Sequence, residues 1–294
     1  MDAHHLMDIA GSLYSHAYGI VNAMLIRLRL PAEICAVYAL LEFLLPRGRR
    51  NSWASYLRGA RFLVVGAVIN TLVFTVVWAV FDPDQVKPLA ILDLGTLTRS
   101  DSLPLRVLGW LVAAFAVSML GNFIYYWLHR AQHAVPLLWR FHKVHHSVRE
   151  MSATNSYHHV TESLLEYVVV LVPMTFLLGV AAGPVPWIVL VITGTQDYFI
   201  HSSTAIDIGP LRYLIGENRF HRIHHSLEAR HFDRNFATST PLWDVLFGTA
   251  YFPQRGEWPE VGFADTQDPQ TIGEFLMMPF RSETPAPTPE RVQA

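Results

Sequence analysis

The sequence predicts an all-α integral membrane protein with about four to five transmembrane or re-entrant helices and a cytoplasmic, histidine-rich helical cap. Hydrophobic residues make up 51% of the 294 positions, which lies above the usual range of soluble globular domains. Three uncharged runs each reach or exceed the roughly 20 residues that cross a bilayer as a helix. These runs are Phe62–Phe81, Val107–Leu128 and Tyr167–Gln196.

The last of these runs predicts a helical hairpin. Tyr167–Gln196 is too long for one untilted crossing and short for two full ones. Gly183, Pro184 and Pro186 interrupt it near the middle, where a helix tends to break. Both a re-entrant and a complete hairpin fit this pattern. Either form leaves and re-enters on one side of the membrane, which returns His201 to the face that holds His129.

Charge predicts the orientation of the helices in the membrane. An N-terminal surface helix is expected to precede a first crossing over about residues 32–45, and five arginines follow that crossing. The connection between the next two crossings, residues 82–101, instead carries four aspartates against one lysine and one arginine. Because positive charge gathers on the cytoplasmic side, we expect the arginine-rich face to be cytoplasmic. The five arginines are Arg47, Arg49, Arg50, Arg58 and Arg61.

Composition excludes several classes of protein. The net charge is −2, so no nucleic-acid surface is indicated. The single cysteine excludes an internal disulfide and a thiolate-ligated cluster. Any metal must therefore bind to nitrogen or oxygen ligands.

Histidines with helical spacing predict a metal site. His129 and His133 are four residues apart in WLHRAQH, so on a helix both rings project from one face. The motif HxxHH then occurs twice, in FHKVHHS and in FHRIHHS, each triplet being predicted to lie along one stripe. Surface histidines often fall at such spacing by chance, but three clusters beside membrane boundaries favour metal binding. The eight candidate catalytic residues are His129, His133, His142, His145, His146, His221, His224 and His225.

So many imidazoles predict two metal ions. Structural zinc is satisfied by four ligands, whereas two further candidates, His159 and His201, raise the predicted set to ten histidines. The neighbouring His158 is an alternative to His159, because only one of the two rings easily faces the site. Side chains predicted to orient the ligands are Glu162, Asp197, Asp233 and Asn235, although a helix-capping or surface role is equally open for them.

The motifs resemble those of the fatty acid hydroxylase and sterol desaturase superfamily. The order HxxxH, HxxHH and HxxHH matches, and so do FIHSS, DRNF and PLWDVLFGT, between Tyr125 and Thr249. The chain departs from the family in YHHVTE, which lacks the proline of the usual segment and gains a histidine. The segments expected on this basis are 1–106 for N-terminal membrane helices and connections, 107–252 for the catalytic domain, and 253–294 for a C-terminal tail, disordered from about residue 281.

The resemblance implies a non-haem di-iron centre that uses O2 at the cytoplasmic face. It also implies a lipid or sterol-like substrate and a separate electron donor such as cytochrome b5, ferredoxin or a reductase. Hydroxylation and desaturation both stay open, as do the substrate and the regiochemistry. The alternative of a different class is a histidine-rich metal-binding or transport protein, whose ligands should line a path near the bilayer midplane. A zinc hydrolase is disfavoured because HExxH is absent.

Overall fold

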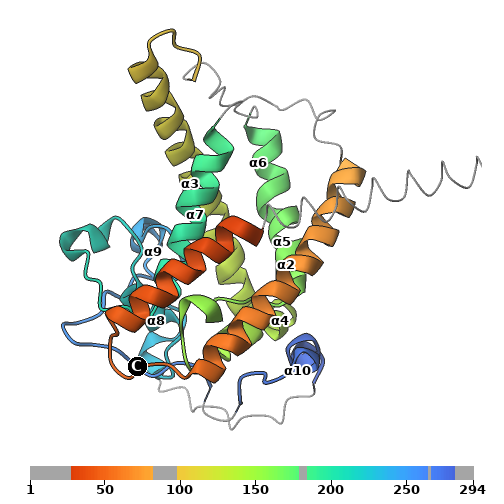
Figure 1. Cartoon of the computed structure of the whole chain (residues 1–294), viewed down its shortest axis with the longest axis vertical. Coiled ribbons are helices and arrows are strands. Elements are labelled where there is room, and N and C mark those ends of the chain that lie inside the picture. The colour runs from red at the N-terminus through yellow and green to blue at the C-terminus, as the bar shows by residue number, and fades with distance from the viewer. Residues whose placement is uncertain (1–27, 82–97, 179–183, 264–265, 282–294) are drawn as a thin grey trace, which may run out of the picture.

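The computed structural model describes residues 28–81, 98–178, 184–263 and 266–281 (Figure 1). Within these ranges the chain is helical, and its only extended pairings are two isolated bridges. The predicted surface helix, most of the acidic connection, Gly183 and the tail beyond 281 lie outside the described residues. The helices are a first helix at residues 28–44, α2 (Trp53–Phe81), α3 (Leu103–Ala134), α4 (Pro136–His146), α5 (Val160–Glu166), α6 (Val172–Leu177), α7 (Val185–His201), α8 (Asn218–His224), α9 (Leu242–Leu246) and α10 (Ile272–Met277).

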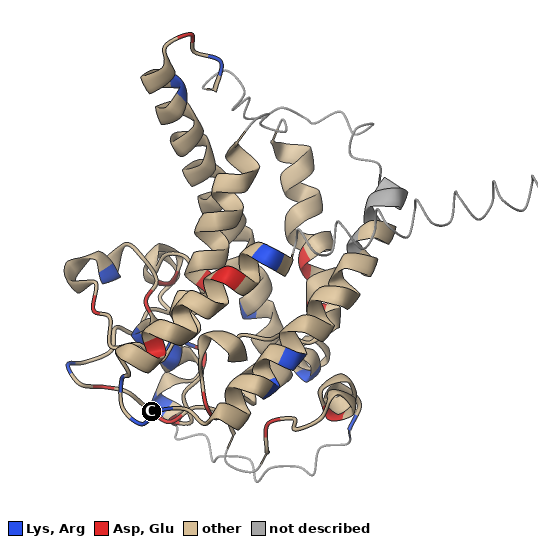
Figure 2. Cartoon of the chain, in the orientation of Figure 1, with Lys and Arg blue, Asp and Glu red and all other residues tan. Residues whose placement is uncertain are grey.

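Three described helical stretches are long and apolar enough to cross a membrane: Trp53–Val73, Leu103–Ala134 and Val160–Leu177. The third is continuous through α5, a π-helical turn at Tyr167–Leu171 and α6. Large apolar side chains such as Phe115 are exposed along α3. Figure 2 shows few charged residues on the upper parts of α3, α6 and α7 and many more at the lower end. These features confirm a predominantly helical membrane protein.

The predicted hairpin is formed by α6 and α7 around α3. α6 ends at Leu177, and α7 begins at Val185 directly after Pro184. Both helices contribute to a buried cluster with Ala113 and Ala114 of α3, whose small side chains allow close packing. With 17 residues, α7 is about 25 Å long, and it ends at His201 beside the lower body of the molecule (Figure 1).

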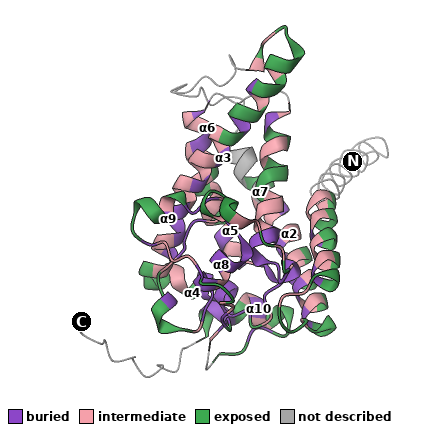
Figure 3. Ribbon diagram, turned by 90° about the vertical axis from the view of Figure 1, so that its left-hand side faces the viewer, coloured by how far each residue is buried: buried purple, intermediate pink, exposed green. Residues whose placement is uncertain are grey.

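Below these helices the short helices form a compact cap, defined here as α4, α8, α9, α10 and their connecting loops. Buried residues concentrate in this lower part of the molecule, as Figure 3 shows. α10 belongs to it, because Phe275 stacks on Phe62 of α2 with ring centroids 4.8 Å apart and meets the edge of Tyr157. Residues 266–281, which fall in the region expected to be a C-terminal tail, thus pack on α2 as part of the cap.

Candidate metal centre

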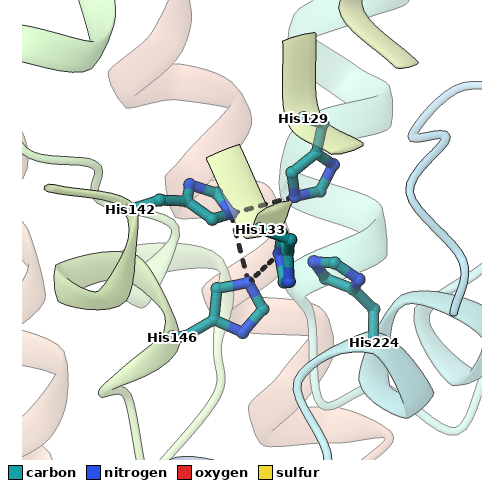
Figure 4. A group of neighbouring side chains, drawn as sticks. All are labelled: His129, His133, His142, His146 and His224. Carbon is teal, nitrogen blue, oxygen red and sulfur yellow. Dashed lines mark hydrogen bonds between the residues drawn. The ribbon is translucent and has the colours of Figure 1, made fainter. Parts of the chain in front are cut away.

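The cap brings nine of the ten predicted ligands together in two adjacent clusters. In each cluster the potential ligand nitrogens lie within 4.8 Å of one another. Figure 4 shows that the five rings of the first cluster point toward a common centre. The first cluster contains His129, His133, His142, His146 and His224, and the second contains His145, His201, His221 and His225.

Helical geometry explains how each HxxHH triplet serves both clusters. On a helix, residues four apart are separated by about 40° around the axis, whereas immediate neighbours are separated by about 100°. In α4, His142 and His146 therefore share the first cluster while His145 turns to the second. α8 does the reverse, since His221 and His225 join the second cluster and a single ring, His224, crosses to the first. The expectation of one stripe per triplet is thus replaced by a division of each triplet between two centres.

The spacing of the nitrogens fits a coordination shell. The Nε2 atoms of His129 and His142 are 2.9 Å apart, and those of His201 and His221 are 3.0 Å apart. Imidazole nitrogens bind transition metals at about 2.0–2.1 Å. Two ligands at right angles around such an ion would be separated by about 3 Å, so the rings already have the distances that a bound ion requires.

The hydrogen bond of one ring nitrogen, Nδ1, determines that the other nitrogen, Nε2, is available to a metal. His145 Nδ1 is 3.1 Å from the Tyr157 carbonyl oxygen, and His201 Nδ1 is 2.8 Å from the Asp197 carbonyl oxygen. A carbonyl only accepts, so in both neutral rings Nδ1 carries the proton and Nε2 presents a bare lone pair. These two Nε2 atoms lie 3.2 Å apart. Neither nitrogen can donate to the other, so their lone pairs repel each other. A cation bound between them would attract both lone pairs.

The first cluster repeats this arrangement. His129 Nδ1 is 2.6 Å from the Phe236 carbonyl oxygen, and His224 Nδ1 is 2.8 Å from the Arg234 carbonyl oxygen. His224 Nε2 is buried and has no hydrogen-bond partner among the described residues. A buried acceptor without a partner is costly, and a metal ion would satisfy it.

Burial keeps the rings of the cap in the neutral form that a metal needs. Desolvation lowers the pKa of His142, His145 and His146 well below the usual value of 6.5, and neighbouring histidines lower it further. The same causes lower the pKa of His221, His224 and His225 well below that value. Protons therefore compete weakly for the ligand nitrogens at neutral pH.

The structure does not bring His159 into either cluster. His159 instead caps α5: its Nδ1 lies 2.8 Å from the Thr161 hydroxyl and its Nε2 lies 3.2 Å from the Leu276 carbonyl oxygen. The neighbouring ring of His158 is stacked on His145 with centroids 3.8 Å apart. His158 also groups with His142 and Glu162. The alternative raised by the YHHVTE segment is therefore the one with the favourable geometry.

The four predicted supporting side chains differ in what they contact. Glu162 meets the expectation, because its Oε2 lies 2.7 Å from His142 Nδ1 and also accepts from Gln132. Asp197 supports His201 through its backbone carbonyl, with its carboxylate 3.5 Å from the same nitrogen. The carboxylate of Asp233 is 3.9 Å from His133 Nδ1, too far for a hydrogen bond.

Asn235 does not accept a ring proton. Its side-chain nitrogen donates to the carbonyls of Phe220 and Tyr251, and its oxygen accepts from the Tyr251 backbone. Asp233 and Asn235 both adopt positive φ, 57° and 60°, a conformation that asparagine and aspartate tolerate better than most residues. The DRNF segment thus supports the site through its backbone carbonyls rather than through the predicted side chains.

Two buried carboxylates that the sequence analysis did not single out hold the loops of the site. Asp244 accepts from the backbone N–H groups of Phe236 and Ala237, each at 2.8 Å, and so fixes the segment whose carbonyl meets His129. Glu42 accepts from the N–H groups of Ala153 and Ser203. The only signal in the sequence was an acidic residue inside an apolar stretch, WDVLF for Asp244 and LLEFLL for Glu42.

The two neighbouring histidines allow a matched comparison. We expect His158→Ala to lower the metal content or the metal affinity of the purified protein, by about 10–100-fold in affinity if the ring only supports a ligand. His159→Ala should leave metal binding unchanged, because the ring nitrogens of His159 contact Thr161 and the Leu276 carbonyl and face neither cluster. Metal analysis of both variants is the measurement. Loss of metal from His159→Ala alone would contradict the arrangement described above.

The fold and site together define a membrane-helix protein with paired, histidine-lined centres that could hold metal ions. Residues 114–249 match the family model described as fatty acid hydroxylase. This match supports a relationship of this region to the fatty acid hydroxylase superfamily. No solved structure matches the chain.

Several curated relatives match about half of the chain. The ornithine lipid hydroxylase OlsE of Rhizobium tropici is 31% identical over 157 residues, which cover 53% of this chain and 44% of that protein. The alkylglycerol monooxygenase of Xenopus tropicalis is 28% identical over 139 residues, 46% of this chain and 29% of the relative. The very-long-chain aldehyde decarbonylase GL1-6 of Oryza sativa subsp. japonica is 31% identical over 140 residues, 44% of this chain and 21% of the relative. The chain thus spans less than half the length of these relatives.

Proposed function

We propose that this chain is an O2-dependent, non-haem di-iron oxidoreductase that hydroxylates or desaturates a lipid or sterol-like substrate in the membrane. The observation that carries this proposal is the pair of adjacent imidazole clusters, in which buried rings direct unprotonated Nε2 atoms toward one another. The names of the relatives support the class of reaction, since they include a lipid hydroxylase and an alkylglycerol monooxygenase. The ligands proposed are the nine clustered histidines. His158, which stacks on His145, replaces His159 as the tenth candidate.

Iron is the metal that fits the proposed chemistry. Imidazole binds iron, copper, nickel and zinc, but zinc has no redox chemistry and is commonly satisfied by four ligands. Iron bound at these histidines would supply the reduction of O2 and the oxidation of an unactivated C–H bond. Hydroxylation consumes the substrate, O2, two electrons and two protons, and it yields the alcohol and one water. The electrons would come from a separate donor, namely cytochrome b5, ferredoxin or a reductase.

The residues of this chain would bind and orient the metal and exclude water. The carbonyls of Tyr157, Arg234 and Phe236 hold protons on the Nδ1 atoms and so direct the Nε2 atoms to the metal. α3 and α7 carry exposed apolar side chains. His133 lies in the last turn of α3, and α7 ends at His201, so both helices lead to the clusters. We expect a lipid chain to approach the metal along these two helices from within the bilayer.

The active site is proposed to face the cytoplasm. Five arginines between residues 47 and 61 lie just before α2 or near its N-terminal end. Positive charge favours the cytoplasmic side. The metal-transport alternative is less favoured. Its ligands should lie along a path at the middle of the membrane helices, whereas these clusters draw on the ends of α3 and α7 and on the cap helices α4 and α8.

Lipid analysis tests the proposed reaction. Cells that express the chain are compared with cells that express the His145→Ala/His224→Ala double variant, one ligand being removed from each cluster. We expect at least one lipid that gains an oxygen atom or loses two hydrogen atoms only when the intact chain is present. Identical lipid profiles in a host that supplies a compatible electron donor, with metal bound to the intact chain, would contradict the proposed activity.

A further inference from the structure

A cavity rich in arginine lies in the cap, separate from the two histidine clusters. It has a volume of about 550 Å³ and is lined in part by five arginines and Trp258. The arginines come from the loop after the first helix, from the segment after α4 and from α8. We call this cavity the arginine pocket. Its arginines are Arg47, Arg49, Arg50, Arg149 and Arg222.

The arginine pocket carries more positive than negative charge, with five arginines among its lining residues. Two glutamates also line it, Glu150 and Glu260. Glu150 is engaged by Ser52, whose backbone N–H and hydroxyl both donate to its carboxylate at 2.9 and 2.8 Å. Within the described ranges, no salt bridge joins a carboxylate to Arg47, Arg49, Arg50 or Arg222. Several guanidinium groups therefore face one space with few counter-charges.

Aromatic rings and carbonyls hold these guanidinium groups in place. The carbon atoms of the Arg222 and Arg47 guanidinium groups lie 4.2 and 5.4 Å from the ring centroid of Trp258. Arg222 Nε donates to the Pro259 carbonyl at 2.7 Å, whereas Arg47 Nε is buried without a partner among the described residues. Like charges fixed close together repel, and an anion between them would relieve the repulsion with charge-assisted hydrogen bonds.

The location of the pocket favours an anion at the membrane surface. The loop that carries Arg47, Arg49 and Arg50 connects two helices whose ends expose large apolar side chains. Leu44 before the loop is 60% exposed, and Trp53 after it is 73% exposed. Such residues suit contact with lipid, and tryptophan is typical of the boundary between lipid and water. Lipid phosphates lie in the headgroup region at that boundary.

We propose that the arginine pocket binds a phosphate group, and that its source is the headgroup of an anionic membrane lipid. Guanidinium groups bind phosphate oxygens in pairs of hydrogen bonds, and the five arginines surround one space from three parts of the chain. The pocket lies next to the metal centre along the chain, because Arg222 sits between His221 and His224 on α8. The proposal is independent of the oxidation reaction and can be tested without turnover.

Calorimetric titration of the full-length, metal-loaded protein in a neutral detergent tests this site. The probes are dihexanoyl phosphatidic acid, inorganic phosphate, polyglutamate and, as the uncharged control that should not bind, dihexanoylglycerol. We expect saturable binding of phosphatidic acid at one site per chain, at least about tenfold weaker in Arg47→Gln/Arg50→Gln and weaker at high salt. Arg255→Gln removes an exposed arginine outside the pocket and should bind as the unaltered protein does. If the double variant unfolds, the single variant Arg50→Gln replaces it in the titration, because Arg50 is exposed.

The probes separate the two sources of phosphate. Tighter binding of phosphatidic acid than of inorganic phosphate supports a lipid headgroup, whereas equal binding supports a phosphate site but overturns the assignment to a lipid. Absence of phosphate binding, or equal affinities in the pocket variants and in Arg255→Gln, overturns the proposal. Binding of polyglutamate without binding of either phosphate probe would also overturn it, in favour of a surface for an acidic protein.

Discussion

Removal of one histidine from each cluster, as His145→Ala with His224→Ala, is expected to abolish lipid oxidation and to deplete bound metal. His145 belongs to the four-histidine cluster and His224 to the five-histidine cluster. Changes to residues that merely support a metal ligand commonly reduce affinity or activity by 10–100-fold, so loss of the ligands should reduce activity by at least about 100-fold. Metal analysis of the purified protein and lipid mass spectrometry measure the two effects.

The single variants make this prediction sharper. His145→Ala should affect mainly the ion of the second cluster and His224→Ala mainly that of the first, because each ring contributes to one cluster only. Each single variant is therefore expected to lose about one of two ions, with His159→Ala as the matched control. An intact protein that binds fewer than about two metal ions per chain, or a double variant with undiminished metal content, would refute the two-ion centre.

The nine clustered histidines could be predicted as candidates because most of them recur at helical spacing. His129 with His133, and His142 with His146, are one turn apart, and the helices that carry them form as expected. The division of each HxxHH triplet between two clusters could not be predicted from either triplet alone. It depends on how α4 and α8 lie relative to each other, and that arrangement depends on contacts between residues far apart in the sequence.

The errors fall where the backbone is not helical. His159 precedes α5 with an extended backbone, so no periodicity indicates whether it or His158 faces the metal centre. Asn235 adopts a left-handed conformation, and the carbonyls beside it accept the ring protons of His129 and His224. Every residue has a carbonyl, so the sequence carries no signal for such a partner. The order of α10 depends on the stacking of Phe275 on Phe62, a contact between distant segments.

Acid is expected to destabilise the metal-free protein strongly below a pH of about 6.5. Six cap histidines have a pKa lowered well below 6.5 by burial: His142, His145, His146, His221, His224 and His225. In the unfolded chain these rings regain their ordinary pKa and take up protons as the pH falls, whereas the folded protein does not. The unfolded state then binds more protons, so the free energy of unfolding decreases with falling pH.

The size of this effect follows from the number of buried rings. Each ring contributes about 1.4 kcal/mol per pH unit between its unfolded and folded pKa. Several rings titrating together should lower the unfolding temperature by on the order of 10 °C between pH 7.5 and pH 5.5, with little change from pH 7.5 to pH 8. Thermal unfolding of the chelator-treated protein in detergent, followed by circular dichroism across this pH range, measures it.

Two comparisons distinguish this cause from general acid sensitivity. His145→Ala/His224→Ala lacks two of the six rings, so its unfolding temperature should depend less steeply on pH. Bound metal adds stability according to its concentration and affinity. The metal-bound protein should therefore unfold at a higher temperature than the metal-free protein until the rings of the folded state take up protons. A metal-free protein whose unfolding temperature is the same at pH 7.5 and pH 5.5 would show that the rings are not buried in their neutral form. The lone-pair argument for a cation between the Nε2 atoms of His145 and His201 would then lose its basis.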